Sequence, residues 1–96
     1  MTLPEPSRVI SALRDPALKE QLAAAEHQRW AHWQSYMHEH GQRNPDGSLT
    51  LPADLVRQWD GQIERPYDEL SDSEKNSDRE QVDRYLPLIE GFLRTT

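Results

Sequence analysis

The chain contains no cysteine among its 96 residues. A protein without thiols forms neither a disulfide framework nor a thiolate zinc site, so its composition gives no sign of an oxidising compartment. The sequence also lacks an apolar stretch near the ~20 residues that cross a bilayer. It does not open with a basic segment followed by an apolar one, which is the pattern of a secretory signal. We therefore expect a cytoplasmic protein that neither spans nor binds a membrane.

Lysine is scarce, with Lys19 and Lys75 as the only two. The chain carries 11 Lys+Arg against 17 Asp+Glu, which gives a formal charge of −6. Proteins that hold nucleic acid neutralise phosphates with clustered cations, so this balance predicts no nucleic acid polymer as partner. Apolar residues make up only 34% of the chain, but three Trp, three Tyr and one Phe supply enough large apolar side chains for a folded core.

The length suits one modest domain, and no strand-like alternation of apolar and polar residues occurs. We therefore predict a small single-domain, all-α fold of about four helices. Residues 1–16 are expected to form an N-terminal arm with at most a turn or two of helix, and residues 17–96 the helical domain.

The first long helix is predicted to begin at Asp15 and Pro16, because a carboxylate caps a helix and proline is tolerated in its first turn. It should continue to about Glu39, with Gly41 ending it. One stripe of this helix, at spacings of three and four, is predicted to face the core and contains Leu18, Leu22, Ala25, Glu26, Arg29, Trp30, Trp33 and Met37.

The second half of the chain contains further turn and helix signals. Residues 44–47, Asn-Pro-Asp-Gly, predict a turn between two helices. Thr50 is expected to cap a helix over about residues 52–63, and residues 65–67 are expected to be extended because Pro66 constrains its neighbour. Ser71 to Glu74 form a capping box that begins the last helix, which Pro87 is expected to kink or restart.

Acid, imidazole, guanidinium and indole groups are crowded on two turns of the first long helix. One interpretation places the tryptophans in the core and pairs Glu26 and Arg29 with other segments. In the other interpretation, a flat ligand ring stacks on the Trp30 indole and the Arg29 guanidinium donates hydrogen bonds to a phosphate. The residues concerned are Glu26, His27, Arg29, Trp30 and Trp33.

A second candidate lies at the start of the last helix, where Lys75 and Arg79 are separated by four residues and share one side. A phosphate could bind there, near the positive end of the helix dipole. The alternative is that these cations pair with neighbouring acids.

The histidines do not form a convincing metal site, since His27, His32, His38 and His40 are spaced by 5, 6 and 2 residues and no pair falls at i, i+4. We expect no metal and no cofactor. Those near the helix C-terminus are expected to be solvated. No serine-histidine-aspartate motif, glycine-rich phosphate loop or cysteine nucleophile occurs, so we also expect no catalysis.

Two segments together resemble the RyR domain, the repeat described in ryanodine receptors and found alone or fused in bacteria and phages. They are Glu26-His27-Gln28-Arg29-Trp30 and the run from Pro66-Tyr67-Asp68-Glu69-Leu70 to Arg79. The resemblance covers about residues 18–92. The middle segment departs from it: Ser35-Tyr36-Met37 and the 44–47 turn replace the usual Gly-Trp and Arg-Asp-Asp type turn.

The resemblance implies a binding module for a nucleotide-derived small molecule, an ADP-ribose-like compound or a cyclic nucleotide immune messenger. The resemblance also implies that Leu70 is a packing residue. It also implies sequestration of this molecule, as by a phage-encoded protein that binds an immune messenger in the host cytoplasm and so evades anti-phage defence. The alternatives are a protein-interaction adaptor with an acidic surface and, less favoured, a nucleotide-cleaving enzyme. The expected ligand-binding residues are Glu26, His27, Trp30, Trp33, Tyr67, Lys75, Asp78 and Arg79.

A homodimer or higher homo-oligomer is also expected. The resemblance gives one copy of a unit that occurs in tandem in the channels, and apolar positions outnumber what four short helices can cover. The competing interpretation folds the arm, residues 3–13, back over the same apolar residues, which are Trp33, Tyr36, Met37, Phe92 and Leu93.

Overall fold

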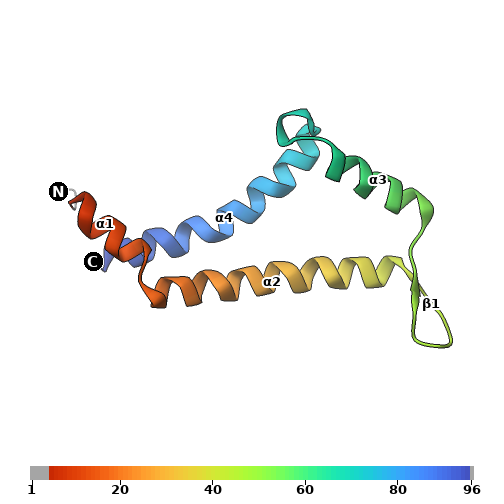
Figure 1. The fold of residues 1–96 in the computed structure, drawn as a ribbon, viewed down its shortest axis with the longest axis horizontal. Coiled ribbons are helices and arrows are strands. Elements are labelled where there is room, and N and C mark those ends of the chain that lie inside the picture. The colour runs from red at the N-terminus through yellow and green to blue at the C-terminus, as the bar shows by residue number, and fades with distance from the viewer. Residues whose placement is uncertain (1–4, 96) are drawn as a thin grey trace. The chain divides into compact units, whose positions relative to one another are not determined.

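The computed structural model describes residues 5–95. Figure 1 labels its four helices: α1 (Pro6–Leu13), α2 (Pro16–His40), α3 (Ala53–Glu64) and α4 (Asp72–Arg94). A short strand pair, β1 (Gln42–Arg43) and β2 (Leu49–Thr50), and one turn of 3-10 helix, η1 (Tyr67–Glu69), complete the described elements. The prediction of a small all-α fold is confirmed. Each helix within residues 5–95 is too short or too polar to cross a bilayer.

The chain divides into two units, which are described separately. The terminal unit combines the described residues 5–29 and 78–95, and therefore contains α1, the first half of α2 and most of α4. The middle unit is residues 30–77, with the second half of α2, the strand pair, α3, η1 and the first turns of α4.

In the terminal unit, the predicted start of α2 is confirmed. The backbone N–H of Ala17 donates to Asp15 Oδ1 at 2.8 Å, so the carboxylate satisfies one of the free donors of the first turn. The arm is helical over Pro6–Leu13, with proline in its first turn, and these 8 residues form about two turns of helix, as expected. Residues 1–4 of the arm lie outside the described residues. Ala12 and Leu18 are the buried side chains among residues 5–95.

Trp30 does not belong to a core, and the prediction that it packs there is wrong. Its side chain is 56% exposed, and that of Trp33 is 41% exposed. The physical reason lies in the neighbours of Trp30 along its own side of α2. Trp33 follows it at i+3, but Gln34 and His38 at i+4 and i+8 line an open hollow with it, so the indole remains at the surface of the middle unit.

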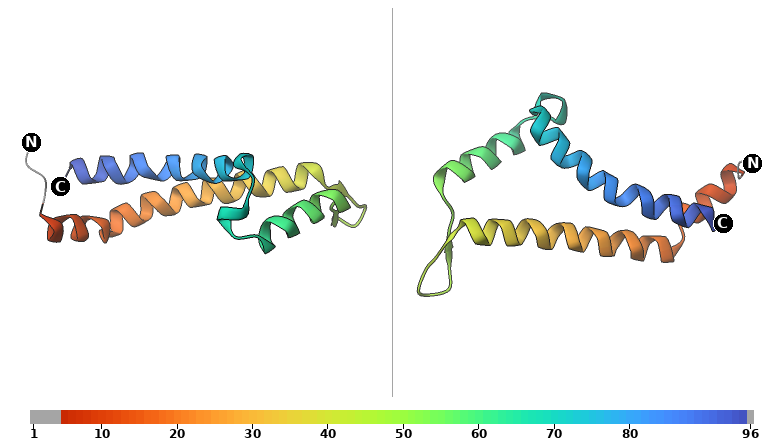
Figure 2. Two further views of the ribbon diagram at one scale, coloured as in Figure 1. Left: turned by 90° about the horizontal axis from the view of Figure 1, so that it is seen from above. Right: turned by 180° about the vertical axis from the view of Figure 1, so that it is seen from behind.

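The turn at residues 44–47 belongs to a β-hairpin that the sequence pattern did not predict. Gln42 pairs with Thr50 and Arg43 with Leu49, and Gly47 closes the turn at φ 89°. Strands of two residues are too short to show alternation, which explains the omission. Thr50 does not cap α3, because it lies in β2 and its Oγ1 accepts a hydrogen bond from Asn44 Nδ2 at 3.0 Å. Figure 2 shows this hairpin between α2 and α3 in two further views.

Gly41 follows the end of α2 as predicted, but not for the predicted reason. Among the described residues only Gly47 has a positive φ, so Gly41 does not form a left-handed cap. A Cβ at Gly41 would lie 2.6 Å from Leu49 Cγ. The glycine therefore allows the Leu49 side chain of β2 to pack directly against the backbone at the end of α2.

The predicted start of α4 is confirmed. The Ser71 N–H donates to Glu74 Oε1 at 3.0 Å, and the Glu74 N–H donates to Ser71 Oγ at 3.2 Å, which is a reciprocal capping box. The backbone at Arg65 is extended as expected, whereas Tyr67 begins η1 and does not continue the extended segment. The helix continues through Pro87 without restarting.

Candidate functional site

The eight predicted ligand-binding residues are divided between the two units. Glu26, His27, Asp78 and Arg79 belong to the terminal unit, and Trp30, Trp33, Tyr67 and Lys75 to the middle unit. Within the units, the structure joins Glu26 to a cluster with Arg29 and Tyr85, brings Lys75 over Tyr67, and places Trp30 in a hollow.

Glu26 is the centre of a hydrogen-bonded cluster that joins α2 to α4 in the terminal unit. Arg29 donates to both oxygens of its carboxylate, with Nε at 3.1 Å from each, and the Tyr85 hydroxyl donates to Oε2. The bonds from Arg29, and then from Tyr85, lower the pKa of Glu26 to about 2. The same carboxylate raises the pKa of Tyr85 and of Arg29. Glu26 is therefore ionised across the physiological range, and its proton-accepting oxygens are already engaged.

Trp30 lines an open hollow of about 420 Å³ in the middle unit. This volume lies within the range of small-molecule sites. The exposed indole presents an apolar ring of the kind that stacks on a flat heterocycle. The hollow is lined by Trp30, Ala31, Gln34, Ser35, His38, Glu39 and Arg43.

Arg43 is the group in this hollow that sequence reasoning missed. It lies in β1, and the contact between Gly41 and Leu49 holds the strand pair at the end of α2, so that the Arg43 side chain lines the same hollow as Trp30. A guanidinium is a planar fork of donors that matches phosphate geometry. The hollow includes the carbonyl end of α2, where the helix dipole disfavours an anion. A phosphate in this hollow would therefore need a positively charged partner, and the Arg43 guanidinium is suited to that role. The Asn-Pro-Asp-Gly turn was the available signal, because it folds the chain back on itself just after Arg43.

The predicted phosphate site at the start of α4 is already occupied in part by the chain's own groups. The Glu74 carboxylate accepts the Ser71 N–H and lies 3.5 Å from Arg65 Nη2. These hydrogen bonds, those with Ser71 first, lower the pKa of Glu74. Lys75 Nζ lies 5.6 Å from the centre of the Tyr67 ring, a cation–π contact that covers one face of that ring. An anion at this helix end would meet the Glu74 carboxylate, so phosphate binding by Lys75 and Arg79 stays a prediction.

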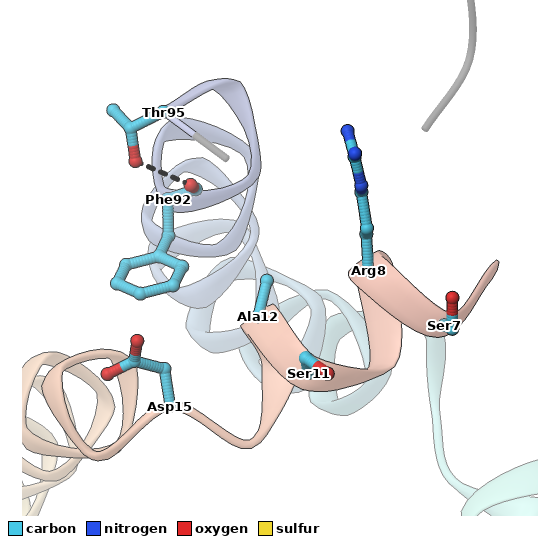
Figure 3. Close-up of a pocket in the computed structure, with 7 residues that line it drawn as sticks. All are labelled: Ser7, Arg8, Ser11, Ala12, Asp15, Phe92 and Thr95. Atoms are coloured by element: carbon cyan, nitrogen blue, oxygen red, sulfur yellow. Dashed lines mark hydrogen bonds between the residues drawn. The ribbon is translucent and has the colours of Figure 1, made fainter. Parts of the chain in front are cut away.

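A second hollow, of about 500 Å³, lies in the terminal unit between α1 and the end of α4. The Phe92 ring points from α4 toward the turn that carries Asp15, and Ala12 lies beside it (Figure 3). Part of the arm therefore does approach Phe92, as the folded-back interpretation expected. Asp15 already caps α2, and a phenyl ring is a weaker stacking and cation–π surface than an indole. The Trp30 hollow is the better candidate for a charged, flat ligand.

The histidines near the end of α2 have local roles. His40 Nδ1 donates to the Tyr36 carbonyl at 2.8 Å, and His38 lines the Trp30 hollow. Both lie in the last turn, where a cation is favoured by the helix dipole. Within residues 5–95, no three His, Asp or Glu side chains gather in a way that could hold a metal ion.

No protein-family model, no curated protein and no solved structure matches this chain. The argument for a function therefore depends on the residues and their geometry.

Proposed function

We propose that this protein is a binding module for a nucleotide-derived small molecule, which it holds in the Trp30 hollow. The observation that carries the proposal is the placement of an indole, 56% exposed, in one hollow with a guanidinium. A large aromatic ring exposed to this degree contributes little to the core of its own chain. More than half of its surface is exposed to solvent, and a ligand could contact this part.

The hollow supplies a separate contact for each part of such a ligand. The Trp30 indole would stack on the base, and Arg43 would bind a phosphate. Gln34 carries an amide that both donates and accepts hydrogen bonds, which suits the edge of a base. The Glu39 carboxylate accepts only, which suits the hydroxyls of a ribose. An ADP-ribose-like compound or a cyclic nucleotide has all these parts.

We propose that binding proceeds without chemistry on the ligand. Glu26, which stands next to His27 on α2, is a carboxylate of the kind that acid–base catalysis uses. With its pKa at about 2 it holds no proton to donate near neutral pH, and its oxygens accept from Arg29 and Tyr85. A binder that does not change its ligand would act by withdrawing it, so sequestration is the proposed role.

The first test is to purify the protein, denature it by heat, filter it and examine the filtrate. The proposal predicts released material that absorbs near 260 nm, and its mass would identify the compound. A protein-interaction adaptor would release no small molecule and would retain a protein partner. An enzyme incubated with the recovered compound would return a changed nucleotide instead of the intact one.

The second test compares variants by titration with the recovered compound. Trp30→Ala should weaken binding by roughly 1–3 kcal/mol, which is about 5- to 150-fold, because stacking on the indole is lost. Arg43→Gln should weaken it by about 1.5–3 kcal/mol through loss of a charge-assisted hydrogen bond. Arg57→Gln, an exposed position on α3 with the same change of charge, is the matched control and should bind as the wild type does.

The same titration decides between the two candidate phosphate sites. If Lys75→Gln weakens binding and Arg43→Gln does not, the phosphate lies at the start of α4, as the sequence predicted, and the Trp30 hollow is not the site. If neither variant weakens binding, the proposal that a phosphate is recognised by these cations is wrong.

A further inference from the structure

The Trp30 hollow contains two opposite charges that are not paired with each other. Arg43 and Glu39 both line it, and both residues are exposed. Neither side chain forms an ion pair with another of residues 5–95. The carbonyl end of α2 adjoins the same hollow and carries about half a negative charge. The single positive charge of Arg43 is therefore already balanced within the hollow before a ligand arrives.

The rest of the middle unit adds negative charge. Residues 30–77 contain four Lys+Arg against nine Asp+Glu, which gives a formal charge of −5 when histidine is counted as neutral. An acidic surface opposes the approach of an anion, and the energy of this repulsion grows in proportion to the charge of the anion. A ligand phosphate in the hollow is therefore tolerated best when it carries one negative charge and not two.

The aromatic surface of the hollow is also limited. Of the described residues that line it, Trp30 alone carries an indole. Trp33 follows three residues further along α2, and its ring meets that of Tyr36 edge to face, with ring centres 5.9 Å apart. The hollow, of about 420 Å³, thus provides one stacking surface, which suits a ligand with one base.

We propose that the ligand of the Trp30 hollow is a cyclic mononucleotide, which has one base and one phosphodiester with a single negative charge. This inference rests on the proposed function, because it narrows the class of nucleotide that the hollow holds. The base stacks on Trp30, the phosphodiester accepts hydrogen bonds from Arg43, and the remaining ribose hydroxyl donates to Glu39.

Other nucleotides bring a second negative charge into the hollow. A terminal phosphate carries nearly two charges near neutral pH, and ADP-ribose and cyclic dinucleotides each contain two phosphate groups. Among the described residues that line the hollow, Arg43 is the one permanent cation, so the second charge would meet Glu39 and the carbonyl end of α2. These ligands are expected to bind at the same indole, but more weakly.

The test is calorimetric titration of the full-length protein with probes that differ in the phosphate. Cyclic AMP is compared with AMP, cyclic GMP with GMP, and both cyclic compounds with ADP-ribose. In at least one pair the cyclic member should bind about fivefold more tightly or better, because one added charge near a carboxylate costs about that factor even in a dielectric as high as that of water. Raising the salt from about 0.02 M to about 0.3 M should reduce this preference, since ions screen exposed charges.

Glu39→Gln tests the charge that sets the preference. Without this carboxylate the doubly charged probes should gain more affinity than the cyclic ones, and the preference should fall at least about twofold. Glu64→Gln makes the same change at an exposed residue in the last turn of α3 and does not touch the hollow, so it is the matched control and should keep the wild-type preference. Helical circular dichroism of each variant checks that the fold is retained.

The outcomes separate a failure of this inference from a failure of the proposed function. If AMP, GMP or ADP-ribose binds as tightly as the cyclic compounds and Trp30→Ala weakens this binding, the nucleotide site stands but its ligand is not a cyclic mononucleotide. If Glu39→Gln and Glu64→Gln change the preference equally, the hollow does not select by charge and the inference is wrong. If no probe binds at several millimolar, or if Trp30→Ala leaves every affinity unchanged, the proposed function is wrong and the inference fails with it.

Discussion

Replacing Gly41 with alanine tests the contact that holds the β1–β2 hairpin at the end of α2. The new Cβ would lie 2.6 Å from Leu49 Cγ and 2.8 and 2.9 Å from its two methyl carbons. Real Cβ atoms do not approach other carbons so closely, so the whole branched end of Leu49 must move. Because Leu49 pairs with Arg43 in the hairpin, the displacement should reach the side chain that we assign to the phosphate.

The size of the effect follows from two opposing terms. Forcing an extra methyl into a packed contact costs about 1–3 kcal/mol. Restricting the unfolded chain by replacing glycine returns about 0.4–1 kcal/mol. The net expectation is a loss of roughly 0.5–2 kcal/mol in the free energy of unfolding, which lowers the melting temperature of a domain this small by about 2–10 °C.

The assay is thermal and urea unfolding at one fixed protein concentration, so that any association contributes equally to all variants. Gly91→Ala is the matched control, since Gly91 lies within α4 and a Cβ there meets nothing within 4 Å. It should stabilise the protein by about 0.5–1 kcal/mol. Adding Leu49→Ala to Gly41→Ala should relieve the clash, so the double variant should lose less than the two single losses together.

The reasoning is refuted if Gly41→Ala is as stable as the wild type, because the close approach of Leu49 would then not exist in solution. Stabilisation by both Gly41→Ala and Gly91→Ala would lead to the same conclusion. A loss that Leu49→Ala does not relieve would place the clash elsewhere.

Three further predictions concern the elements around the site. The hydrogen bonds from Arg29 and Tyr85 lower the pKa of Glu26 from 4.5 to about 2. The contribution of Glu26 to stability is therefore present above pH 4.5 and is lost as the pH falls toward 2. Glu26→Gln should flatten this part of an acid titration that is followed by circular dichroism. Ser71→Ala removes the side-chain cap of α4 and should cost about 1 kcal/mol in urea unfolding. Gly47→Ala forces a side chain into a positive φ of 89° and should cost about 1–2 kcal/mol, measured in the same way.

Local signals in the sequence predicted the helices well. The cap at Asp15, the capping box at Ser71 and the extended backbone before Pro66 all occur as expected, because each depends on atoms within a few residues. The hairpin was missed since its strands are two residues long. The Asn-Pro-Asp-Gly turn indicated that the chain reverses just after Arg43, but not which hollow the Arg43 side chain lines, because this depends on how Leu49 packs against Gly41 across the turn.

The stripe of α2 shows a different limit. Spacing at three and four residues places Leu18 and Trp30 on related sides of one helix, yet Leu18 is 1% exposed and Trp30 is 56% exposed. Periodicity identifies residues that could share a face, but burial depends on whether another element covers that face. Leu18 belongs to the terminal unit and is buried there, whereas Trp30 lines an open hollow of the middle unit. The exposure of Trp30, which supports the binding proposal, therefore became visible only in the structure.

The three tryptophans allow the central claim to be tested in one measurement. Each indole gives one N–H signal in a nitrogen-15 correlation spectrum, and a Trp30→Phe variant assigns the signal of Trp30 among those of Trp33 and Trp59. AMP, ADP-ribose and a cyclic dinucleotide are added separately, up to several millimolar. The account predicts that at least one of them shifts the Trp30 signal saturably while the Trp59 signal, on α3, stays in place. If none of the three moves the Trp30 signal, or if Trp59 moves and Trp30 does not, Trp30 is not the platform of a nucleotide site and the proposed function is wrong.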